Sequence, residues 1–412
     1  MPPMMIVDPA NLLVIICISS HRVAATVAQL HPEQPDRGEQ VVAHKSIDCF
    51  WHELSERGQR TVVREVLSAA EASAGIEALS VFMTMSVPGV ATRSAMGWAA
   101  LGDEVALGPA EKALALRRVR EQATGVDREL IEVWPTQWLV RDRTGEHEVD
   151  DPVGQVGSHL SCQALLISAK RGLREQLESL ARDCSLDLEG VVAQPLAVYR
   201  GIAGRLKNRG SSLVIDCGAR QTTVLVRRRD KLVHGEVHAF GGDDLTRRIA
   251  ESLNCEPVEA EKLKREIDIS SPHSSTTAHE GQQLIFADLV KDNRRTATAA
   301  KVCEDAVTDF FRSIASDLRS HGMLAQQGSV HLLGRAAQLG GMIPTVRDCF
   351  ELPVVLGSGD KARQPTDELD GILTSGLVRI CADRRRDLIA SQSATFRKTA
   401  SGLWSWLAKP IA

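Results

Sequence analysis

The sequence predicts an α/β protein with two lobes of mixed sheets and helices, and three observations support this fold class. The chain has 412 residues, which is longer than a single domain usually is. Two strand–turn–strand patterns begin at Leu12 and Leu213, about 200 residues apart, so one hairpin opens each half of a duplicated architecture. Segments with the apolar spacing of helices follow both hairpins. In folds of this kind, ligand sites lie between the halves.

The composition argues against several other classes of protein. Hydrophobic residues make up 43% of the chain and charged residues 25%, so neither a disordered nor a membrane-embedded body is expected. A net charge of −4 argues against a nucleic-acid partner held by bulk positive charge. The nine cysteines are scattered, which is typical of a reduced, cytosolic protein without disulfides or a zinc knuckle. The apolar run at 12–18 lacks a basic leader and is too short to span a bilayer, so we expect a buried strand there.

The first half is predicted to contain one lobe and a smaller inserted domain. An apolar run at 12–18, a polar turn at 19–22 and a second apolar run at 23–28 form the first hairpin. From about residue 87 to residue 167, Gly and Pro separate shorter segments, which indicates a different domain. The spacing of apolar residues predicts helices at 61–74 and 108–122 and strands at 79–85, 130–139 and 159–168.

The second half repeats the hairpin and then becomes mainly helical. A polar stretch rich in Ser and Thr at 269–281 is predicted to be an exposed loop. The folded body is expected to end near Ile380, and the Arg- and Ser-rich residues 383–400 are expected to form a linker. The remaining elements are predicted as helices at 170–183, 243–253, 257–267 and 297–318 and strands at 188–192, 213–218, 223–226, 232–240 and 330–333.

The two hairpin turns are candidates for binding phosphate. A phosphate cradle needs backbone N–H groups that approach an anion closely, beside an acidic residue that holds a metal ion. The second turn has Asp216 at a strand end followed by Gly218, whereas the first has Ser19 and Ser20 but no carboxylate. Ordinary hairpin turns also favour Gly, Ser and Asp, so the spacing alone leaves a purely structural role open.

Several segments, taken in order, resemble the bacterial actin homologue FtsA. They are residues 14–25, 134–137, 151–154, 214–226, 241–242, 260–264 and 333–341. The resemblance extends from about Leu12 to Ile380 and implies the actin-like ATPase fold with a small domain inserted in the first half. The implied division is a first lobe at 1–85, an inserted domain at 86–167, a second lobe at 168–240 and 326–382 with its own small domain at 241–325, a linker at 383–393 and an amphipathic helix at 394–412.

The resemblance also implies a nucleotide site, with ATP as its ligand. In that family the two hairpin turns are phosphate loops, the segment like 260–264 contacts adenosine and ribose, and the turn at Gly334 packs near the base. A bound Mg²⁺ would lie near Asp216, and no cluster of protein ligands for a metal is expected elsewhere. The implied nucleotide-binding residues are Ser19, Ser20, Arg22, Asp216, Gly218, Ala219, Gln221, Gly241, Gly242, Glu261, Lys264, Gly334, Arg335 and Ala336.

The chain departs from the family pattern at positions that matter for chemistry. Cys17 and Thr223 stand where the family usually has carboxylates, and Ala219, Arg220 and Arg335 stand where it has glycines. Added side chains hinder the approach of backbone to phosphate, and fewer carboxylates leave fewer ligands for Mg²⁺. We therefore expect weak or degenerate binding of ATP and Mg²⁺ and at most slow hydrolysis, and we assign no catalytic residue.

The last part of the chain has the pattern of an amphipathic helix. At about 100° per residue, Phe396, Leu403 and Leu407 fall on one stripe, and Lys398 and Lys409 lie opposite. Burial contributes roughly 1.5–3 kcal/mol per apolar side chain, and anionic lipid about 1 kcal/mol per nearby cation. A modest, reversible membrane anchor is therefore predicted; the alternative is a helix that docks on its own body or in a partner's groove. The predicted membrane-binding residues are Phe396, Arg397, Lys398, Leu403, Trp404, Trp406, Leu407 and Lys409.

The resemblance implies an adaptor in cell division. The FtsA family tethers a tubulin-like division polymer to the cytoplasmic face of the inner membrane at the septum, and its members associate with one another. Two alternatives share the fold. The pilus-assembly adaptor PilM has no terminal amphipathic helix, whereas a phosphotransferase of the sugar-kinase or chaperone type needs cleft carboxylates where this chain has Cys17, Gln194 and Thr223.

Overall fold

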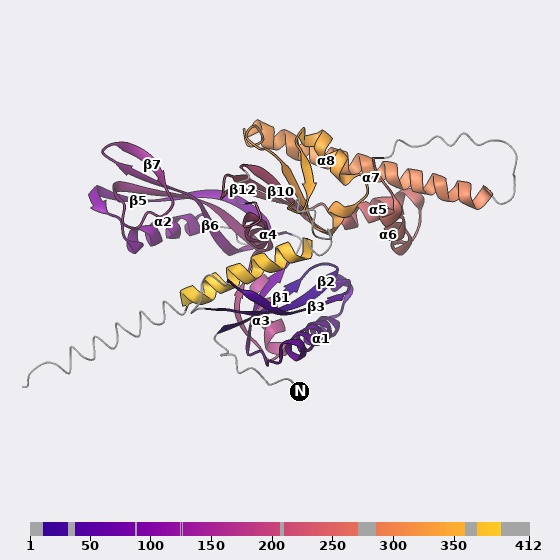
Figure 1. The fold of residues 1–412 in the computed structure, drawn as a ribbon, viewed down its shortest axis with the longest axis horizontal. Helices are drawn as coiled ribbons and strands as arrows, with labels where there is room; N and C mark the ends of the chain where they lie inside the picture. The colour runs from indigo at the N-terminus through magenta and orange to yellow at the C-terminus, as the bar shows by residue number, and fades with distance from the viewer. Residues whose placement is uncertain are drawn as a thin grey trace, which may run out of the picture.

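Two five-stranded sheets with the same strand topology form the two lobes in the computed structural model (Figure 1). In each sheet, three antiparallel strands are followed by two parallel ones, which confirms the predicted duplicated α/β architecture. The structure describes residues 11–31, 38–86, 89–123, 125, 127–206, 210–270, 286–358 and 369–388, and only the backbone of 286–293.

The first lobe contains the sheet β3-β2-β1-β4-β9, whose strands β1, β2 and β4 are mostly buried on both faces. Because a strand covered on both sides needs apolar residues throughout, β1 is a continuous apolar run. Val14 and Ile16 face α1 and α3, whereas Leu13 and Ile15 face the centre of the molecule. The strands are β1 (Leu12–Ile18), β2 (Arg22–Gln29), β3 (Gln40–Asp48), β4 (Ser80–Met85) and β9 (Asp187–Val191), and the helices are α1 (Glu56–Ala74) and α3 (Leu173–Asp183).

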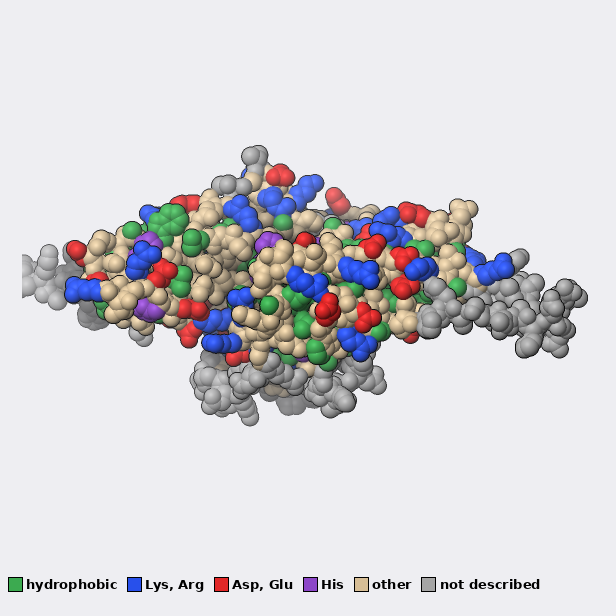
Figure 2. Space-filling model, turned by 90° about the horizontal axis from the view of Figure 1, so that it is seen from above, with side chains coloured by type: hydrophobic (Ala, Val, Ile, Leu, Met, Phe, Trp, Pro, Cys, Tyr) green, Lys and Arg blue, Asp and Glu red, His purple; other side chains and the backbone are tan. Residues whose placement is uncertain are grey.

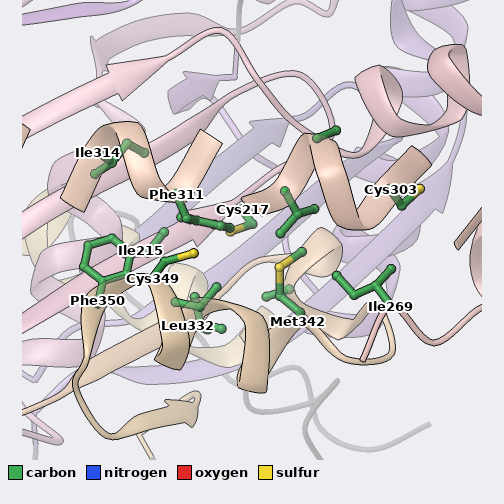
Figure 3. Packing of buried hydrophobic residues seen from close by; sticks show 14 of the residues in the cluster. Ile215, Cys217, Ile269, Cys303, Phe311, Ile314, Leu332, Met342, Cys349 and Phe350 are labelled. Atoms are coloured by element: carbon green, nitrogen blue, oxygen red, sulfur yellow. The ribbon is translucent and has the colours of Figure 1, made fainter. Parts of the chain in front are cut away.

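The second lobe contains the sheet β12-β11-β10-β13-β14, covered by four helices. Ile215 and Leu332 on the sheet pack with Phe311 of α7 and with Met342 and Phe350 of α8 (Figure 3). Its strands are β10 (Ser212–Cys217), β11 (Thr222–Arg228), β12 (Lys231–His238), β13 (Val330–Leu333) and β14 (Val354–Leu356), and its helices are α5 (Gly242–Leu253), α6 (Pro257–Glu266), α7 (Phe286–Ser320) and α8 (Met342–Phe350).

A third sheet, of order β5-β8-β6-β7, projects from the first half and is covered on one face by α2 (Figure 1). A Cβ on Gly97 would lie 2.2 Å from the carbonyl oxygen of Ala115, so this contact between strand and helix needs glycine. The sequence did not predict β5 or β7; β5 is rich in Ala and Gly, which do not favour strands. These elements are β5 (Ala91–Ala106), α2 (Pro109–Glu121), β6 (Arg128–Asp142), β7 (Gly145–Val149) and β8 (Val156–Lys170).

Two helices cross between the lobes, α4 (Gln194–Ala203) and the helix at 369–388, hereafter the C-terminal helix. Their side chains join one core with residues of both large sheets. A Cβ on Gly201 would lie 1.8 Å from the carbonyl oxygen of Ile372, and one on Gly376 would lie 1.7 Å from that of Ala197. The two backbones therefore touch, and glycine at both positions is required for this crossing.

The C-terminal helix extends further than the sequence predicted. The body was expected to end near Ile380 and a linker to begin at residue 383, but the helix continues to residue 388. No Gly or Pro interrupts the chain between 377 and 388, so nothing in the sequence ends the helix there. Residues 383–388 are therefore part of the folded body.

The run Arg384–Arg386, which the sequence placed in a linker, pairs with acidic residues of the folded body. Arg384 pairs with a glutamate of the third sheet, and Arg385 and Arg386 pair with glutamates of the first lobe. The Arg384 guanidinium also donates to the carbonyl oxygen of Val191 at 2.7 Å. The three arginines bind the end of the C-terminal helix to both units.

The remaining predictions for the tail lie outside the described residues. These include the membrane-binding residues at 396–409, the rest of the helix at 394–412, and the predicted loop from residue 271 onwards. Among the helices that the structure describes, none combines the length and the apolar character needed to cross a bilayer.

Candidate functional site

The second hairpin turn and the start of α5 are locked together through their backbones. The N–H groups of Gly242 and Asp243 donate to the carbonyl oxygens of Gly218 and Ala219, at 3.0 and 2.7 Å. A Cβ on Gly241 would lie 2.4 Å from the Ala219 oxygen, so only glycine permits this approach. The helix N-terminus therefore uses two of its N–H groups to hold the turn, and these two are not free for an anion.

Asp216 is a buried carboxyl group at the end of β10. Its side-chain partner among the described residues is Gln194, whose Nε2 lies 3.4 Å from Oδ2, and no ion pair to Asp216 occurs in that part of the chain. Burial raises the pKa of Asp216 to about 6, although the bond from Gln194 opposes the shift. An acid buried with so few donors is a site that a cation would complete.

A second unsatisfied group lies in the same turn. The Gln221 residue is 5% exposed, and its side-chain oxygen Oε1 has no hydrogen-bond partner. Gly334 closes the other side of Asp216: its φ is +80°, and a Cβ there would lie 2.6 Å from Asp216 Oδ1 and 2.3 Å from the carbonyl oxygen of Cys217. The second turn and the turn at Gly334 thus hold one buried acid and one buried acceptor, which fits a ligand that brings a cation and hydrogen-bond donors.

Glu261 and Lys264 lie beside the start of α5, as part of a polar cluster on α6. The Lys264 Nζ lies 2.6 Å from Glu261 Oε2, 2.8 Å from the Thr246 hydroxyl and 2.9 Å from the Gly242 carbonyl oxygen. Burial raises the pKa of Glu261, but hydrogen bonds from Lys264 and Thr246 outweigh it and leave that pKa below its usual value. The ammonium is therefore already occupied by groups of the chain itself. Ala336 lies next to Gly242, 3.5 Å from the position of a Cβ there.

The first hairpin turn reaches across to the second lobe. Ser19 is held within the turn, since its hydroxyl donates to the Arg22 carbonyl oxygen at 2.9 Å. The His21 ring nitrogen Nε2 lies 3.0 Å from Asp243 Oδ1, and Arg220 Nε lies 3.5 Å from the other oxygen of the same carboxylate. The start of α5 is thereby contacted by side chains from both hairpin turns.

Two arginines and two aspartates form a network beside these turns. Arg22 lies 2.8 Å from Asp48 and 2.5 Å from Asp370, and Arg335 lies 3.7 Å from each of the same two carboxylates. The hydrogen bond from Arg22 lowers the pKa of Asp48. Arg22 is thus engaged between segments far apart in the chain and is not a solvated turn residue.

The structure brings the sequence-predicted residues together, because all three turns, α5 and α6 meet at one place. It also adds residues that the sequence reasoning missed, namely His21, Asp48, Thr246 and Asp370. Asp48 ends β3, a strand that was not predicted, and Asp370 belongs to no recognisable motif. For His21, the only indication in the sequence was its position within the predicted first turn. No group of three or more metal-ligating side chains able to hold an ion was found among the described residues.

Comparisons with known proteins agree with this arrangement. The family model described as "Cell division protein FtsA" matches residues 213–373, which include the second turn, α5, α6 and the turn at Gly334. The cell division protein FtsA of Bacillus subtilis (strain 168) is 25% identical over 248 residues, which are 59% of this chain and 56% of that protein. That of Agrobacterium fabrum (strain C58 / ATCC 33970) is 24% identical over 376 residues, 84% of this chain and 81% of that protein.

Among solved structures, the PilM–PilN type IV pilus biogenesis complex matches with a TM-score of 0.59 and 15% sequence identity, over 89% of this chain and 97% of that one. The duplicated sheets and the turns between them define an actin-like ATPase fold. The chain is thus similar to FtsA proteins, in the family model over residues 213–373 and in the Agrobacterium match over most of its length. The match to the Bacillus protein spans little more than half of that protein's length.

Proposed function

We propose that this chain is an actin-like adaptor of cell division that links a tubulin-like division polymer to the cytoplasmic face of the cell membrane at the septum. The observation that carries the proposal is the FtsA match over 213–373, which covers the second turn and both helices beside it. Self-association of the folded bodies would bring together many of the predicted C-terminal amphipathic helices. Each would bind the membrane weakly, but together they would attach the assembly firmly.

The turns between the lobes support weak binding of ATP. Asp216 would hold Mg²⁺, directly or through water, and Gln221 and the turn at Gly334 would face the nucleotide. Bound Mg²⁺ would neutralise the phosphates. Binding is expected to be weak because Gly242 and Asp243 already donate to the turn. Hydrolysis is expected to be slow at most, because the strand end of the first lobe offers a neutral Cys17 thiol in place of a carboxylate.

The membrane role is tested by sedimentation with liposomes that contain anionic lipid. The intact chain is expected to pellet with the vesicles and to carry the tubulin-like division protein of the same organism with it. A form that ends at residue 393 is expected to stay in the supernatant. Equal pelleting of both forms would contradict the anchor, and pelleting without the division protein would contradict the adaptor role.

The nucleotide role is tested separately, by titration with a fluorescent ATP analogue in the presence of Mg²⁺. Saturable binding that weakens when Asp216 is replaced by Asn is expected. Absence of saturable binding would remove ATP from the proposal and leave the adaptor role intact.

A pilus-assembly adaptor is the second candidate, since the fold matches that of the PilM–PilN complex. Such an adaptor binds the short cytoplasmic segment of a membrane partner and needs no lipid anchor. Vesicle binding by the chain that depends on residues 394–412 would favour the division adaptor, because only that function uses a tail.

A further inference from the structure

The inner faces of the two large sheets change from apolar to polar at the ends of their central strands. Along β1, Leu13 and Ile15 point into the core that the two lobes share. Side chains two positions apart on a strand lie on the same face, and Cys17 accordingly packs against the same core at the end of β1. The thiol is thus the last inward-facing group of this strand.

The same alternation places Thr84 and Asp216 on the inner faces. Phe82 of β4 and Val214 of β10 lie in the shared core, and Thr84 and Asp216 each follow two residues later. Thr84 lies directly opposite Cys17 in the parallel pairing of β1 with β4. The carboxyl ends of these strands therefore bring a thiol and a hydroxyl from the first lobe, and a carboxyl group from the second, to the inner side of the sheets.

Electrostatics place these strand ends near one another across the lobes. Burial is the largest cause of the raised pKa of the Cys17 thiol, and the charges of Asp370 and then Asp216 add to it. A carboxylate shifts the pKa of a thiol in this way when the two groups are close. Thr84, on the strand beside Cys17, therefore faces the space in which Asp216 lies.

The Thr84 hydroxyl is buried without a hydrogen-bond partner. On the face of the body in Figure 2, acidic and basic side chains lie interspersed and meet solvent, whereas Thr84 lies inside and is 1% exposed. Its Oγ1 has no partner among the described residues. The buried Thr26 of the same sheet shows the ordinary case, since its Oγ1 lies 2.9 Å from His44 Nδ1. A buried polar group without a partner is costly and rare, and a ligand or an enclosed water is its usual complement.

The two first-lobe groups differ in what they offer a cation. Mg²⁺ prefers oxygen ligands and keeps several of its waters when it is bound. The Cys17 thiol is neutral, and sulfur suits softer metals. Of these two groups, the Thr84 hydroxyl is the one that offers an oxygen, and it can accept a hydrogen bond from a water molecule.

We propose that Thr84 is a positioning residue of the cation site, and that its hydroxyl accepts a hydrogen bond from a water bound to the Mg²⁺ that Asp216 holds. Asp216 would hold the cation from the second lobe, and Thr84 would hold it through water from the first. This inference rests on the proposed binding of ATP and Mg²⁺. It adds a first-lobe contact that the hairpin turns do not supply, and the hydroxyl gains its partner when the ligand binds.

Thr84→Val removes the hydroxyl and keeps the shape of the side chain. In the ligand-free chain this variant is expected to melt about 2 °C higher, because an unsatisfied polar group has been removed. Thr26→Val is the matched control. It deletes a buried hydroxyl that has a partner, so it is expected to melt about 2 °C lower. An unchanged or lower melting temperature for Thr84→Val would overturn the proposal, since the hydroxyl would then have a partner before any ligand binds.

Ligand binding is measured on the full-length chain by titrating Mg²⁺ at a fixed concentration of a fluorescent ATP analogue. The Mg²⁺ concentration for half-maximal binding is expected to rise about five-fold in Thr84→Val, which corresponds to one lost hydrogen bond. It is expected to stay within about two-fold of the unchanged chain in Thr84→Ser, which keeps the hydroxyl, and in Thr26→Val. An unchanged Mg²⁺ requirement in Thr84→Val, or an equal rise in Thr84→Ser, would overturn the proposal.

The role of Thr84 and the proposed nucleotide site fail in different ways. Absence of Mg²⁺-dependent binding to the unchanged chain would remove ATP from the proposed function, and the role of Thr84 with it. Binding that Thr84→Val leaves intact would overturn the role of Thr84 alone, and the nucleotide site would stand. A more stable ligand-free chain together with a weaker cation site is a pair of effects that a purely structural role of Thr84 would not produce.

Discussion

The hairpins that open the two lobes share one topology but differ in the side chain at the strand end. Cys17 lies one residue before the end of β1, between β2 and β4, and Asp216 lies one residue before the end of β10, between β11 and β13. Burial, together with the charges of Asp370 and Asp216, raises the pKa of the Cys17 thiol to about 12, so the thiol is neutral. Burial raises the pKa of the Asp216 carboxyl to about 6, so near pH 7 much of it carries a charge.

The turns beyond these strand ends also pack differently. The first is held by side-chain ion pairs of Arg22, and the second by backbone contacts between Ala219 and the start of α5. The comparison teaches that the repeated sheet fixes where the strand ends lie, whereas the residue at each end decides what it can bind. We infer that the capacity to bind a cation lies in the second lobe. Substitutions at the two ends test this asymmetry.

The largest effect on stability is expected from Gly334→Ala, which disturbs the packing at the end of β10 and leaves the end of β1 unchanged. Gly334 has φ +80° and ψ 161°, a conformation almost confined to glycine, and the added Cβ would lie 2.3 Å from the backbone oxygen of Cys217. Strain and overpacking together are expected to lower the free energy of unfolding by about 3–5 kcal/mol. Urea denaturation followed by circular dichroism measures the change.

Gly322→Ala is the matched control for Gly334→Ala. Gly322 also has a positive φ, +65°, but no atom lies within 4 Å of the position of its Cβ. Its substitution is therefore expected to cost only the left-handed backbone term, about 1–2 kcal/mol. Equal losses for the two variants would mean that the contact with the β10 strand end contributes nothing.

Asp216→Asn is expected to stabilise the protein at neutral pH. The native pKa of about 6 lies above the ordinary value of 3.8, so the folded protein binds this proton more tightly than the unfolded chain does. At pH below 3.8 both states are protonated and Asp216 carries no penalty. As the pH rises from 3.8 to 6, stability is lost, by about 3 kcal/mol in all, and the loss persists above pH 6.

The measurement is the difference in unfolding free energy between Asp216→Asn and the unchanged chain, taken from pH 4 to pH 8. Asn keeps the shape of Asp and retains an oxygen that accepts a hydrogen bond from Gln194. Because both proteins contain all the other titrating groups, the contributions of those groups to the pH dependence cancel in the difference. Asp216→Asn should gain about 2.4 kcal/mol relative to the unchanged chain between the two ends of this range, because part of the full loss has already occurred at pH 4. A difference that does not vary with pH would mean that the Asp216 carboxyl is not held in a desolvated site.

Much of the fold could be predicted from the sequence because strands buried on both faces are unbroken apolar runs. β1 and β10 show this directly, and their repeat indicated the duplication. β5 could not be predicted in the same way, since its Ala and Gly residues become a strand through the contact with α2 at Gly97. That contact involves a helix elsewhere in the chain, and no local pattern encodes it.

The residues of the candidate site likewise fall into two groups, those placed by a local turn and those brought together by tertiary packing. The glycines and Asp216 of the second turn were predicted because a turn places them locally. Asp370 was not, because it joins Arg22 across 348 positions of sequence. Arg384 was misjudged for the same reason, since its partner Glu132 lies on the third sheet. Ion pairs between distant segments depend on tertiary packing, which the charge pattern of one segment does not reveal.

The smallest effect on stability is expected from Cys17→Asp, which places an acid at the end of β1, as Asp216 does at the end of β10. The new carboxylate would lie near Asp216 and Asp370, so about 1–2 kcal/mol of stability is expected to be lost at pH 7. Two acids at facing strand ends offer the oxygen ligands that Mg²⁺ prefers. A concentration of free Mg²⁺ about five times its dissociation constant would restore about 1 kcal/mol of the free energy of unfolding. Denaturation with and without MgCl₂ compares Cys17→Asp with Cys17→Ser, and an equal response of the two would show that the strand ends do not face one shared space.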